Sequence, residues 1–399
     1  MVDYLVVTVV GFATVAVLAP LARWLAVKIG AVDQPGGRRV HTRPTARLGG
    51  LALFCGFLAA IGVASRLETF EPVFATTSDP EAIVLASVVI LVVGLIDDLR
   101  GVSAPVKLAG QVLAAGTLVL FGVILRFVYI PGSPGSVVVL ATDLGVLFTV
   151  VAIVAMINAV NLIDGLDGLA AGIVAIASIA LFTYVQFADL LTDALAPSAL
   201  LIFAALAGMC LGFLVHNSHP ASIFMGDSGA MLLGLLMGAA GVLAIGGTLQ
   251  PAGSDFAAFS IPVLVPVLVL AVPFLDTIWT ILRRIRSGRA VFSPDKKHLH
   301  HRLIEIGHSH RRAVLIMYYW SALLAFGAVG VGLFPLPLVV GVLAAGVGLA
   351  VAVTVTRSVV TRSWRRGRRD DALATPASTQ GSGPDEDASD QRKRVPRRL

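Results

Sequence analysis

Long apolar runs constrain the fold of this chain more than any other feature of its sequence. A helix needs about 20 predominantly apolar residues to cross the bilayer core, which is about 30 Å thick. The chain is 57% hydrophobic and only 14% charged, which is unusual for a soluble domain. We therefore predict an all-α polytopic membrane protein with about 11 transmembrane helices, at residues 4–24, 48–65, 81–97, 105–122, 145–161, 168–185, 198–215, 227–247, 259–281, 313–333 and 336–356.

The distribution of basic residues predicts the orientation of these spans. Lysine and arginine collect after the first and ninth spans and in the C-terminal tail, whereas the loops after the second, sixth and eighth spans are acidic or neutral. Positive loops stay in the cytoplasm, so we expect a multi-pass plasma membrane protein with an extracytoplasmic N-terminus and a cytoplasmic C-terminus. Orientation explains most of the net charge of +6; attraction to anionic lipids or a phosphate-bearing substrate is a second explanation. Nucleic acid is not an expected partner.

One integral membrane domain is predicted over residues 1–357. Residues 358–399 are polar and rich in Pro, Ser, Gly and charge, which predicts a disordered cytoplasmic tail. Residues 126–145 alternate β-branched residues around a Pro-Gly-rich centre and predict a short extracytoplasmic β-hairpin. Both cysteines, Cys55 and Cys210, fall within predicted spans, so neither a disulfide framework nor a cysteine zinc site is supported.

Five polar clusters interrupt the apolar pattern, and the predicted topology places all of them on the cytoplasmic side. Several discontinuous segments that converge on one membrane face are typical of an active-site cleft assembled by helix packing. A transport pathway would more often place its ionisable groups near the middle of the membrane. The clusters lie at residues 38–50, 97–107, 158–168, 216–229 and 293–312.

Asp97 and Asp98 end an apolar run, where the helix dipole already disfavours negative charge and the two carboxylates repel each other. A solvated helix end is the simpler explanation, but a polar stop could have used Lys or Arg without this penalty, so we favour a functional pair. Lys107 follows Ser103-Ala104-Pro105, which has the form of a helix start. An ammonium at a helix N-terminus favours anion binding, although a lone lysine there more often extends to the membrane interface.

The segment "NAVNLIDGLDG", residues 158–168, places a polar group at every third position. Three-residue steps advance about 300° around a helix, so one ion cannot contact the whole row. Gly165 and Gly168 are expected to end or loosen the helix. The four polar residues are Asn158, Asn161, Asp164 and Asp167.

Two further clusters contain candidate ligands. Asp227, between Gly226 and Ser228, suits Mg²⁺, which prefers oxygen ligands and is held by one or two carboxylates plus substrate phosphates; a helix-capping aspartate is the alternative. In "HLHH", we favour imidazoles that bind phosphate oxygens over a zinc site, because the spacing is not that of a zinc protease. His308 and His310 are expected to be surface residues. The "HLHH" histidines are His298, His300 and His301.

Together these motifs resemble one family. "DDLRGVSAPVKLAGQ", "NAVNLIDGLDGLAAG", "IFMGDSGA" and "HLHHRL" occur in this order, and the resemblance, over about residues 1–356, is to the polyprenyl-phosphate N-acetylhexosamine-1-phosphate transferases. "HLHH" and "VHTRPTARLGG" are similar to the UDP-N-acetylglucosamine branch, and the basic segment that contains the histidines further resembles actinobacterial enzymes that begin arabinogalactan linker synthesis. The alternatives are a phospho-MurNAc-pentapeptide translocase-type transferase, and a transporter of lipids or nucleotide sugars, for which Asp276 is the candidate ionisable group.

The resemblance implies that sugar-1-phosphate passes from a UDP-sugar to a polyprenyl phosphate with Mg²⁺, or Mn²⁺ as a substitute, and that UMP is released. A homodimer is one option for the assembly. By motif position, Asp97, Asp98, Lys107 and the "HLHH" histidines are the expected catalytic residues. Asp227 and Asn161 are the expected metal ligands, with Asn158 and Asn161 directed toward the pyrophosphate and Asp164 and Asp167 toward the nucleoside. The remaining expected substrate-binding residues are Asn217, Phe224 and His41.

Overall fold

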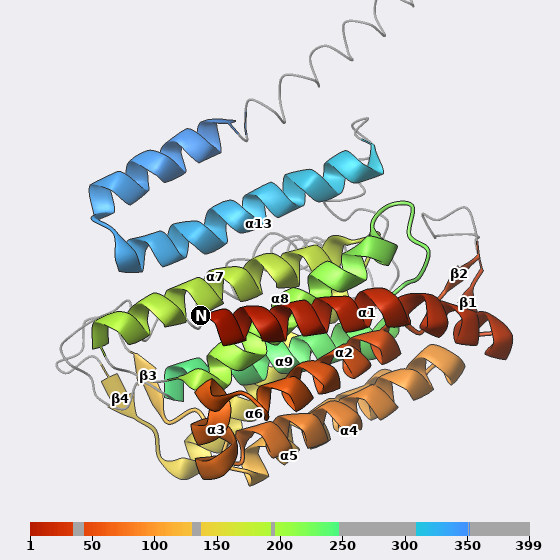
Figure 1. Ribbon diagram of the computed structural model, residues 1–399, viewed down its shortest axis with the longest axis horizontal. Helices are drawn as coiled ribbons and strands as arrows, with labels where there is room; N and C mark the ends of the chain where they lie inside the picture. The colour runs from red at the N-terminus through yellow and green to blue at the C-terminus, as the bar shows by residue number, and fades with distance from the viewer. Residues whose placement is uncertain (35–43, 130–136, 193–195, 247–308, 350, 352–399) are drawn as a thin grey trace, which may run out of the picture. The chain divides into compact units, whose positions relative to one another are not determined.

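The computed structural model describes residues 1–34, 44–129, 137–192, 196–246, 309–349 and 351. Most of these residues are helical, and the long helices run roughly side by side (Figure 1). The helices are α1 (Val2–Ile29), α2 (Gly49–Ala64), α3 (Glu71–Thr76), α4 (Asp79–Arg100), α5 (Ala104–Leu120), α6 (Thr142–Ile163), α7 (Leu169–Thr192), α8 (Pro197–Asn217), α9 (Gly226–Gly246) and α13 (His310–Leu333), with a 3-10 turn at Glu68–Phe70.

Seven of the described helices are long and apolar enough to cross a membrane, namely α1, α4, α6, α7, α8, α9 and α13. This agrees with the prediction of a mostly helical, multi-pass membrane protein. The count of 11 stays a prediction, because the span expected at 259–281 lies outside the described residues. Two other expected spans are short apolar helices in the structure, Ala104–Leu120 and Leu336–Leu349.

The second predicted span, residues 48–65, matches α2, but the chain bends sharply just after it. α2 and the segment Glu68–Thr76 meet at 95°. Polar Ser65 and Arg66 follow the end of α2, and Pro72 stands in the first turn of α3, where its fixed backbone angle suits a helix start. A short, differently directed helix therefore begins in the segment that was expected to be a loop.

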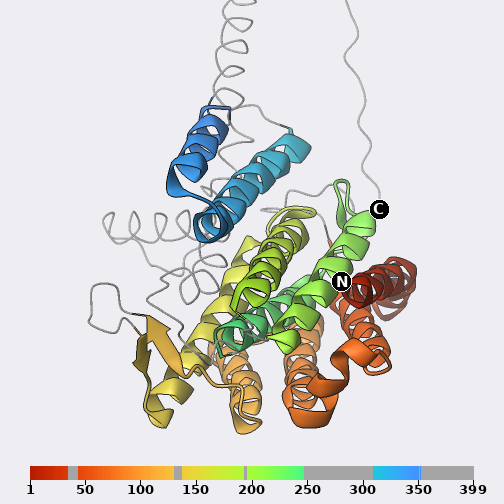
Figure 2. The ribbon, with the colours of Figure 1, turned by 60° about the vertical axis from the view of Figure 1, so that its left-hand side comes forward.

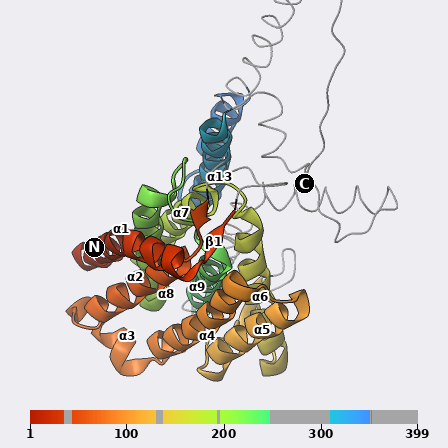
Figure 3. The same ribbon diagram turned by 90° about the vertical axis from the view of Figure 1, so that its right-hand side faces the viewer.

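The buried centre of the bundle is formed by α8 and α9, which are the helices most enclosed by the rest of the protein. α9 packs against α2, α4, α6 and α8, and Figure 3, which looks roughly along the helices, shows it among them. Because nearly every side chain of such a helix faces protein, α9 is apolar on all sides beyond its first turn. Its N-terminal residues are therefore held by neighbours on several sides.

Two short strand pairs lie beside the helices. β1 (Val32–Asp33) pairs antiparallel with β2 (Thr45–Ala46), and β3 (Phe127–Tyr129) pairs antiparallel with β4 (Val137–Val139). The second pair is seen beside α6 in Figure 2 and falls in the segment for which a hairpin was expected. Its connecting residues, and the expected tail at 358–399, lie outside the described residues.

Candidate active site

The polar ends of five helices meet at one end of the bundle, and Asp98 lies at the centre of this arrangement. Its Oδ1 accepts a hydrogen bond from the Asp227 amide at 2.8 Å, and its Oδ2 accepts from the Ser228 amide at 3.1 Å and from the Ser228 hydroxyl at 2.6 Å. The first amides of a helix have no partner within the helix and carry partial positive charge. The Asp98 carboxylate, at the end of α4, thus caps the N-terminus of α9.

Gly226 makes this cap sterically possible. Its φ is +71°, and a Cβ at this position would lie 2.5 Å from Asp98 Oδ2 and 2.7 Å from the carbonyl oxygen of Arg47. The atom nearest to that Cβ position is an oxygen of Asp98, so a side chain at residue 226 would collide with the capping carboxylate.

Replacing Gly226 with alanine should therefore destabilise the protein. The left-handed backbone and the contact with Asp98 together should cost about 1–3 kcal/mol in the free energy of unfolding. The measurement is the thermal unfolding midpoint of the detergent-purified protein. Gly116→Ala in α5 is the matched control, because a Cβ there meets nothing within 4 Å; equal midpoints for the two variants would contradict this account of Gly226.

Asp97 makes different contacts from its neighbour. Its Oδ1 accepts from the Val102 amide at 2.7 Å, and its Oδ2 forms an ion pair with Lys107. Lys107 lies in the first turn of α5, which begins at Ala104 after Ser103 as the sequence predicted. The same ammonium lies 3.1 Å from Asp227 Oδ1. Lys107 therefore bridges two carboxylates that belong to different helices, and this relieves the repulsion expected at the end of α4.

Asp227 also receives a hydrogen bond from α6. Asn161 Nδ2 donates to Asp227 Oδ1 at 2.6 Å. The Asp227 side chain is 36% exposed, whereas that of Asp97 is 7% exposed, so Asp227 is the more accessible carboxylate. Two carboxylates and an amide are oxygen donors of the kind that Mg²⁺ selects. The donor set fits the expected ion, with Asp227 and Asn161 as the residues that would hold it.

Asn158 does not reach this group of residues. α6 is helical to Ile163, and the Asn158 side chain is paired with Gln111 of α5 and with the Val154 carbonyl. The expected direct contact of Asn158 with the pyrophosphate and metal is therefore not supported by its position. The physical reason is that Gln111 bonds both the oxygen and the nitrogen of the Asn158 side chain. The sequence did not reveal this partner, because Gln111 is a single polar residue within an apolar span.

Asp164 follows the end of α6, where the helix gives way to a turn. Burial, together with the negative charges of Asp227, Asp98 and Asp167, raises the pKa of this carboxyl to about 7. A neutral carboxylic acid can donate a hydrogen bond, so Asp164 is able to act as a donor near neutral pH. This property was not evident from its place in the row of polar residues.

The raised pKa of Asp164 predicts a pH-dependent stability. The pKa is about 7 in the folded protein and 3.8 as the ordinary value, so the folded state retains a proton that the unfolded state loses. The stabilisation is complete below about pH 4 and is lost as the pH rises through about 7. Asp164→Asn, which is neutral throughout, should lack this decline when unfolding free energies are compared from pH 4 to 8. Identical pH slopes for the two proteins would contradict the assignment.

Asp167, in the turn between α6 and α7, is held by the loop after α8. Its Oδ2 lies 2.7 Å from His219 Nδ1 and accepts from the Ala221 amide at 3.1 Å. The His219 ring stacks on that of His310, with centroids 4.1 Å apart and planes 13° apart. His310 was expected to be a surface residue, but it is only partly exposed, because the first turn of α13 packs against this loop.

The three side chains of Asp167, His219 and His310 lie close enough to suggest a metal site. The lone pair of an imidazole nitrogen lies in the plane of its ring, and two nearly parallel planes cannot direct their lone pairs at one ion. The stacked rings therefore favour a packing role for this cluster. His219 was missed by sequence analysis, since a histidine in a polar loop has no spacing that marks it.

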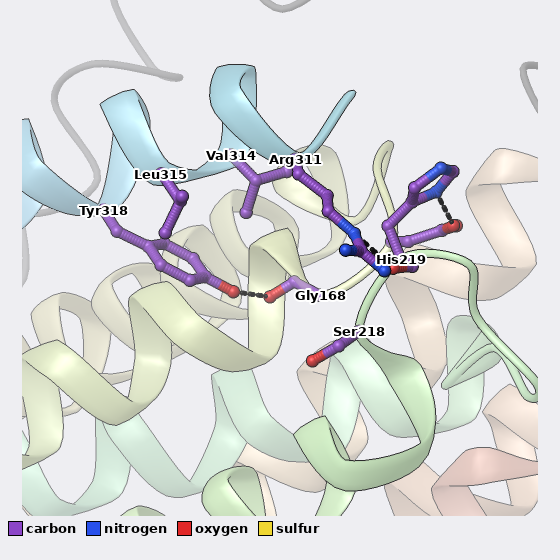
Figure 4. Close-up of a pocket in the computed structure, with 8 residues that line it drawn as sticks. Gly168, Ser218, His219, Arg311, Val314, Leu315 and Tyr318 are labelled. Atoms are coloured by element: carbon purple, nitrogen blue, oxygen red, sulfur yellow. Dashed lines mark hydrogen bonds and ion pairs between the residues drawn. The ribbon is translucent and has the colours of Figure 1, made fainter. Parts of the chain in front are cut away.

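Two further contacts join α13 to the α6–α7 turn and to the loop after α8 (Figure 4). The Tyr318 hydroxyl donates to the Gly168 carbonyl, and Arg311 Nε donates to the His219 carbonyl at 2.9 Å. A cavity of about 230 Å³ lies between these elements. It is lined by Asp167, Gly168, Ser218, His219, Arg311, Val314, Leu315 and Tyr318.

Asn217, at the end of α8, is buried rather than available to a ligand. It is 2% exposed, its Oδ1 accepts from the Gly168 amide at 3.0 Å, and its Nδ2 donates to the Ile223 carbonyl at 2.9 Å. Direct substrate binding by Asn217 does not fit this position, because both ends of the amide are already paired. Its contacts instead join the α6–α7 turn to the loop before α9.

The segment that precedes α2 reaches the same region through its backbone. The Phe224 amide donates to the Ala46 carbonyl at 2.8 Å, and the Gly49 amide donates to the Phe224 carbonyl at 3.0 Å. The structure thus brings together residues from all five predicted clusters, because His310 and Arg311 of the fifth contact His219. The substrate contact of the Phe224 side chain stays a prediction. His41, His298, His300 and His301, like Asp276, lie outside the described residues.

Comparisons with known proteins identify the family. The family described as glycosyl transferase family 4 matches residues 81–245. The decaprenyl-phosphate N-acetylglucosaminephosphotransferase of Mycolicibacterium smegmatis is 45% identical over 338 residues, which are 84% of this chain and 83% of that protein. The chain belongs to glycosyl transferase family 4. The matched segment of this family 4 member contains Asp97, Asp98, Lys107, Asn161 and Asp227, the residues that meet at the end of the bundle.

A second relative extends the similarity beyond mycobacteria. The probable undecaprenyl-phosphate N-acetylglucosaminyl 1-phosphate transferase of Bacillus subtilis is 35% identical over 334 residues, which are 82% of this chain and 85% of that protein. Both similarities extend over most of the length of this family 4 member. The family suggested by the motifs is thereby confirmed.

Proposed function

We propose that this protein transfers N-acetylglucosamine-1-phosphate from UDP-N-acetylglucosamine to a polyprenyl phosphate. UMP is released and polyprenyl-diphospho-N-acetylglucosamine is formed, as the first lipid-linked step of a cell-wall polysaccharide. The observation that carries the proposal is the convergence of Lys107, Asn161 and Asp227, with Asp97 beside them. The chain is also similar over most of its length to transferases whose names give a polyprenyl phosphate and a transferred N-acetylglucosamine phosphate. The name of the Mycolicibacterium smegmatis relative suggests decaprenyl phosphate as the acceptor.

The reaction requires one bond to form and one to break. A phosphate oxygen of the lipid attacks the β-phosphorus of the donor, the bond from this phosphorus to the oxygen bridging it to the α-phosphorus breaks, and UMP leaves with that oxygen. A phosphate monoester has a second pKa of about 6, so the acceptor is mostly dianionic at neutral pH. The acceptor oxygen is therefore already nucleophilic, and a general base is not required.

Charge neutralisation is then the main task of the protein. Attack on a diphosphate gathers several negative charges, and fixed positive groups stabilise the transition state most effectively when they are already in place. Lys107 is held in position by Asp97 and Asp227. Mg²⁺, bound by Asp227 and Asn161, would supply Lewis acidity toward the phosphate oxygens. Asp98 supports the arrangement by fixing the N-terminus of α9.

We further propose that this end of the bundle faces the cytoplasm. Arg47, Arg100 and Arg311 lie at or near it, whereas the opposite end carries acidic Glu68, Glu71 and Asp79, a distribution that the positive-inside rule places with the basic end in the cytoplasm. A cytoplasmic site would also match the compartment that contains nucleotide sugars. The extracytoplasmic position of β3 and β4 follows from the same orientation.

A transporter is the competing class of function. The charged residues described above lie at helix ends or in the turns between helices, whereas transporters place binding groups at broken helices near the membrane midplane. Detergent-solubilised protein separates the two classes, because UMP release needs no membrane. UDP-N-acetylglucosamine should support turnover with lipid phosphate, and UDP-MurNAc-pentapeptide and UDP-N-acetylgalactosamine should not. Turnover with the pentapeptide donor would assign a translocase-type reaction instead, and no turnover with any donor would favour transport.

A further inference from the structure

A reciprocal amide pair lies within the apolar interior, between α5 and α6. Asn158 Nδ2 donates to Gln111 Oε1 at 2.7 Å, and Gln111 Nε2 donates to Asn158 Oδ1 at 3.3 Å. Gln111 is 1% exposed, and its Nε2 also lies 3.6 Å from the sulfur of Met231 on α9. This pair belongs to none of the reacting groups described above.

Stability alone is a poor explanation for two amides at this depth. A buried amide is unfavourable unless it is paired, and an interhelical hydrogen bond within a membrane contributes only about 0.6 kcal/mol on average. Two apolar side chains of similar size would hold α5 and α6 together about equally well. The amide pair differs from such side chains in direction, because both hydrogen bonds form at only one register of the two helices.

The amide pair lies one helical turn below the residues of the candidate active site. Gln111 follows Lys107 by four residues on α5, Asn158 precedes Asn161 by three on α6, and Met231 follows Asp227 by four on α9. Residues three or four apart share one face of a helix. The contacting group Gln111, Asn158 and Met231 therefore forms a layer one turn deeper than the contacting group Lys107, Asn161 and Asp227, and the same three helices provide both layers.

We propose that Gln111, paired with Asn158, is a positioning residue for the transfer reaction. The amide pair fixes the register of α5 and α6, so that Lys107 and Asn161 converge on Asp227 Oδ1 at 3.1 and 2.6 Å. This inference rests on the proposed function. It also explains why Asn158 belongs to the polar row of residues 158–168 although it lies one turn deeper than the site.

The test replaces both amides at once. Gln111→Leu/Asn158→Leu leaves no unpaired polar group, and replacing both partners with apolar groups of similar shape can be nearly neutral for stability. We expect a thermal unfolding midpoint close to that of the wild type and a kcat at least about tenfold lower, since a displacement of about 1 Å can cost about 100-fold in rate. KM for UDP-N-acetylglucosamine should change by less than about threefold, because groups that bind the nucleoside lie elsewhere.

Two further variants make the result specific. Thr117→Val, on the same helix, removes a buried hydroxyl that bonds only within α5, to the Leu113 carbonyl, and should leave kcat unchanged. Gln111→Asn/Asn158→Gln retains two amides of the same total length and should recover most of the lost kcat. If Gln111→Leu/Asn158→Leu does not fold, Gln111→Met/Asn158→Leu, which also removes both amides, provides the same comparison.

The outcomes separate this inference from the proposed function. Wild-type protein that releases no UMP refutes the proposed function. Active wild type with an equally active double-leucine variant overturns the positioning role of Gln111 and leaves the function intact. A variant that loses only stability, with a normal kcat for each folded molecule, also overturns the positioning role.

Discussion

Asp227→Asn should lower turnover about 1,000-fold at saturating substrates, the upper range for removal of one preorganised charge-stabilising group. Asp227 is the carboxylate that both Lys107 and Asn161 contact, and its side chain is partly exposed. The variant removes the charge and retains the size of the side chain. Because the Asp227 backbone amide still donates to Asp98, the capped start of α9 should persist and the protein should fold.

The metal assignment has a readout that does not depend on turnover. Mn²⁺ binding to the purified protein without substrates, measured by electron paramagnetic resonance, should be weakened at least about tenfold in Asp227→Asn, since a carboxylate ligand contributes both charge and coordination. Asp143→Asn is the matched control, because Asp143 is an exposed carboxylate in the first turn of α6, at the opposite end from Asn161. Unchanged Mn²⁺ binding and normal activity in Asp227→Asn would show that the ion is bound elsewhere.

Asp98→Asn should reduce turnover about 100-fold or more, by an equal factor at every pH from 6.5 to 8.5, because the displaced α9 moves Asp227. An asparagine offers one acceptor oxygen where Asp98 uses two, and its NH₂ group faces the donors of α9. Hydrogen bonds to a charged group contribute about 1.5–3 kcal/mol each, so the unfolding midpoint should also fall. Activity and thermal unfolding of the same preparation measure both effects.

The pH profile separates positioning from proton transfer. If Asp98 accepted a proton from the lipid phosphate, the loss in Asp98→Asn would shrink as the pH rose above about 6, because the acceptor becomes dianionic without help. A pH-independent loss is the expected result for a positioning role.

Ser228→Ala, which removes one of the three donors to Asp98, should lower the free energy of unfolding by about 1 kcal/mol. This loss of stability is smaller than the one expected for Asp98→Asn.

Much of the fold could be predicted from apolar run length, because backbone groups within a bilayer must be paired inside a helix. α4, for example, was expected at residues 81–97 and occupies Asp79–Arg100. The bend after α2 was missed because a short polar break can either end a span or redirect it. The convergence of polar clusters was predicted from alternating topology, which needs only the number of crossings between them.

Individual partners within the site could not be predicted. Gln111 and Asn158 are 47 residues apart, and no local pattern pairs them. Asn217 was assigned to substrate by its motif, although helix packing buries it against the α6–α7 turn. His310 looked like one of several exposed histidines until α13 was placed against His219. Each of these errors concerns a contact between distant segments, which depends on packing rather than on residue type or spacing.

The fate of the β-phosphorus of the donor tests the central claim most directly. Purified protein in detergent is given UDP-N-acetylglucosamine labelled with ³²P at the β-phosphorus, together with polyprenyl phosphate and Mg²⁺. Transfer of sugar-1-phosphate predicts that the label enters the organic-soluble lipid while an equal amount of unlabelled UMP is released. Label that remains in UDP while sugar enters the lipid would show ordinary glycosyl transfer, and the absence of both label and sugar from the lipid would contradict the proposed reaction altogether.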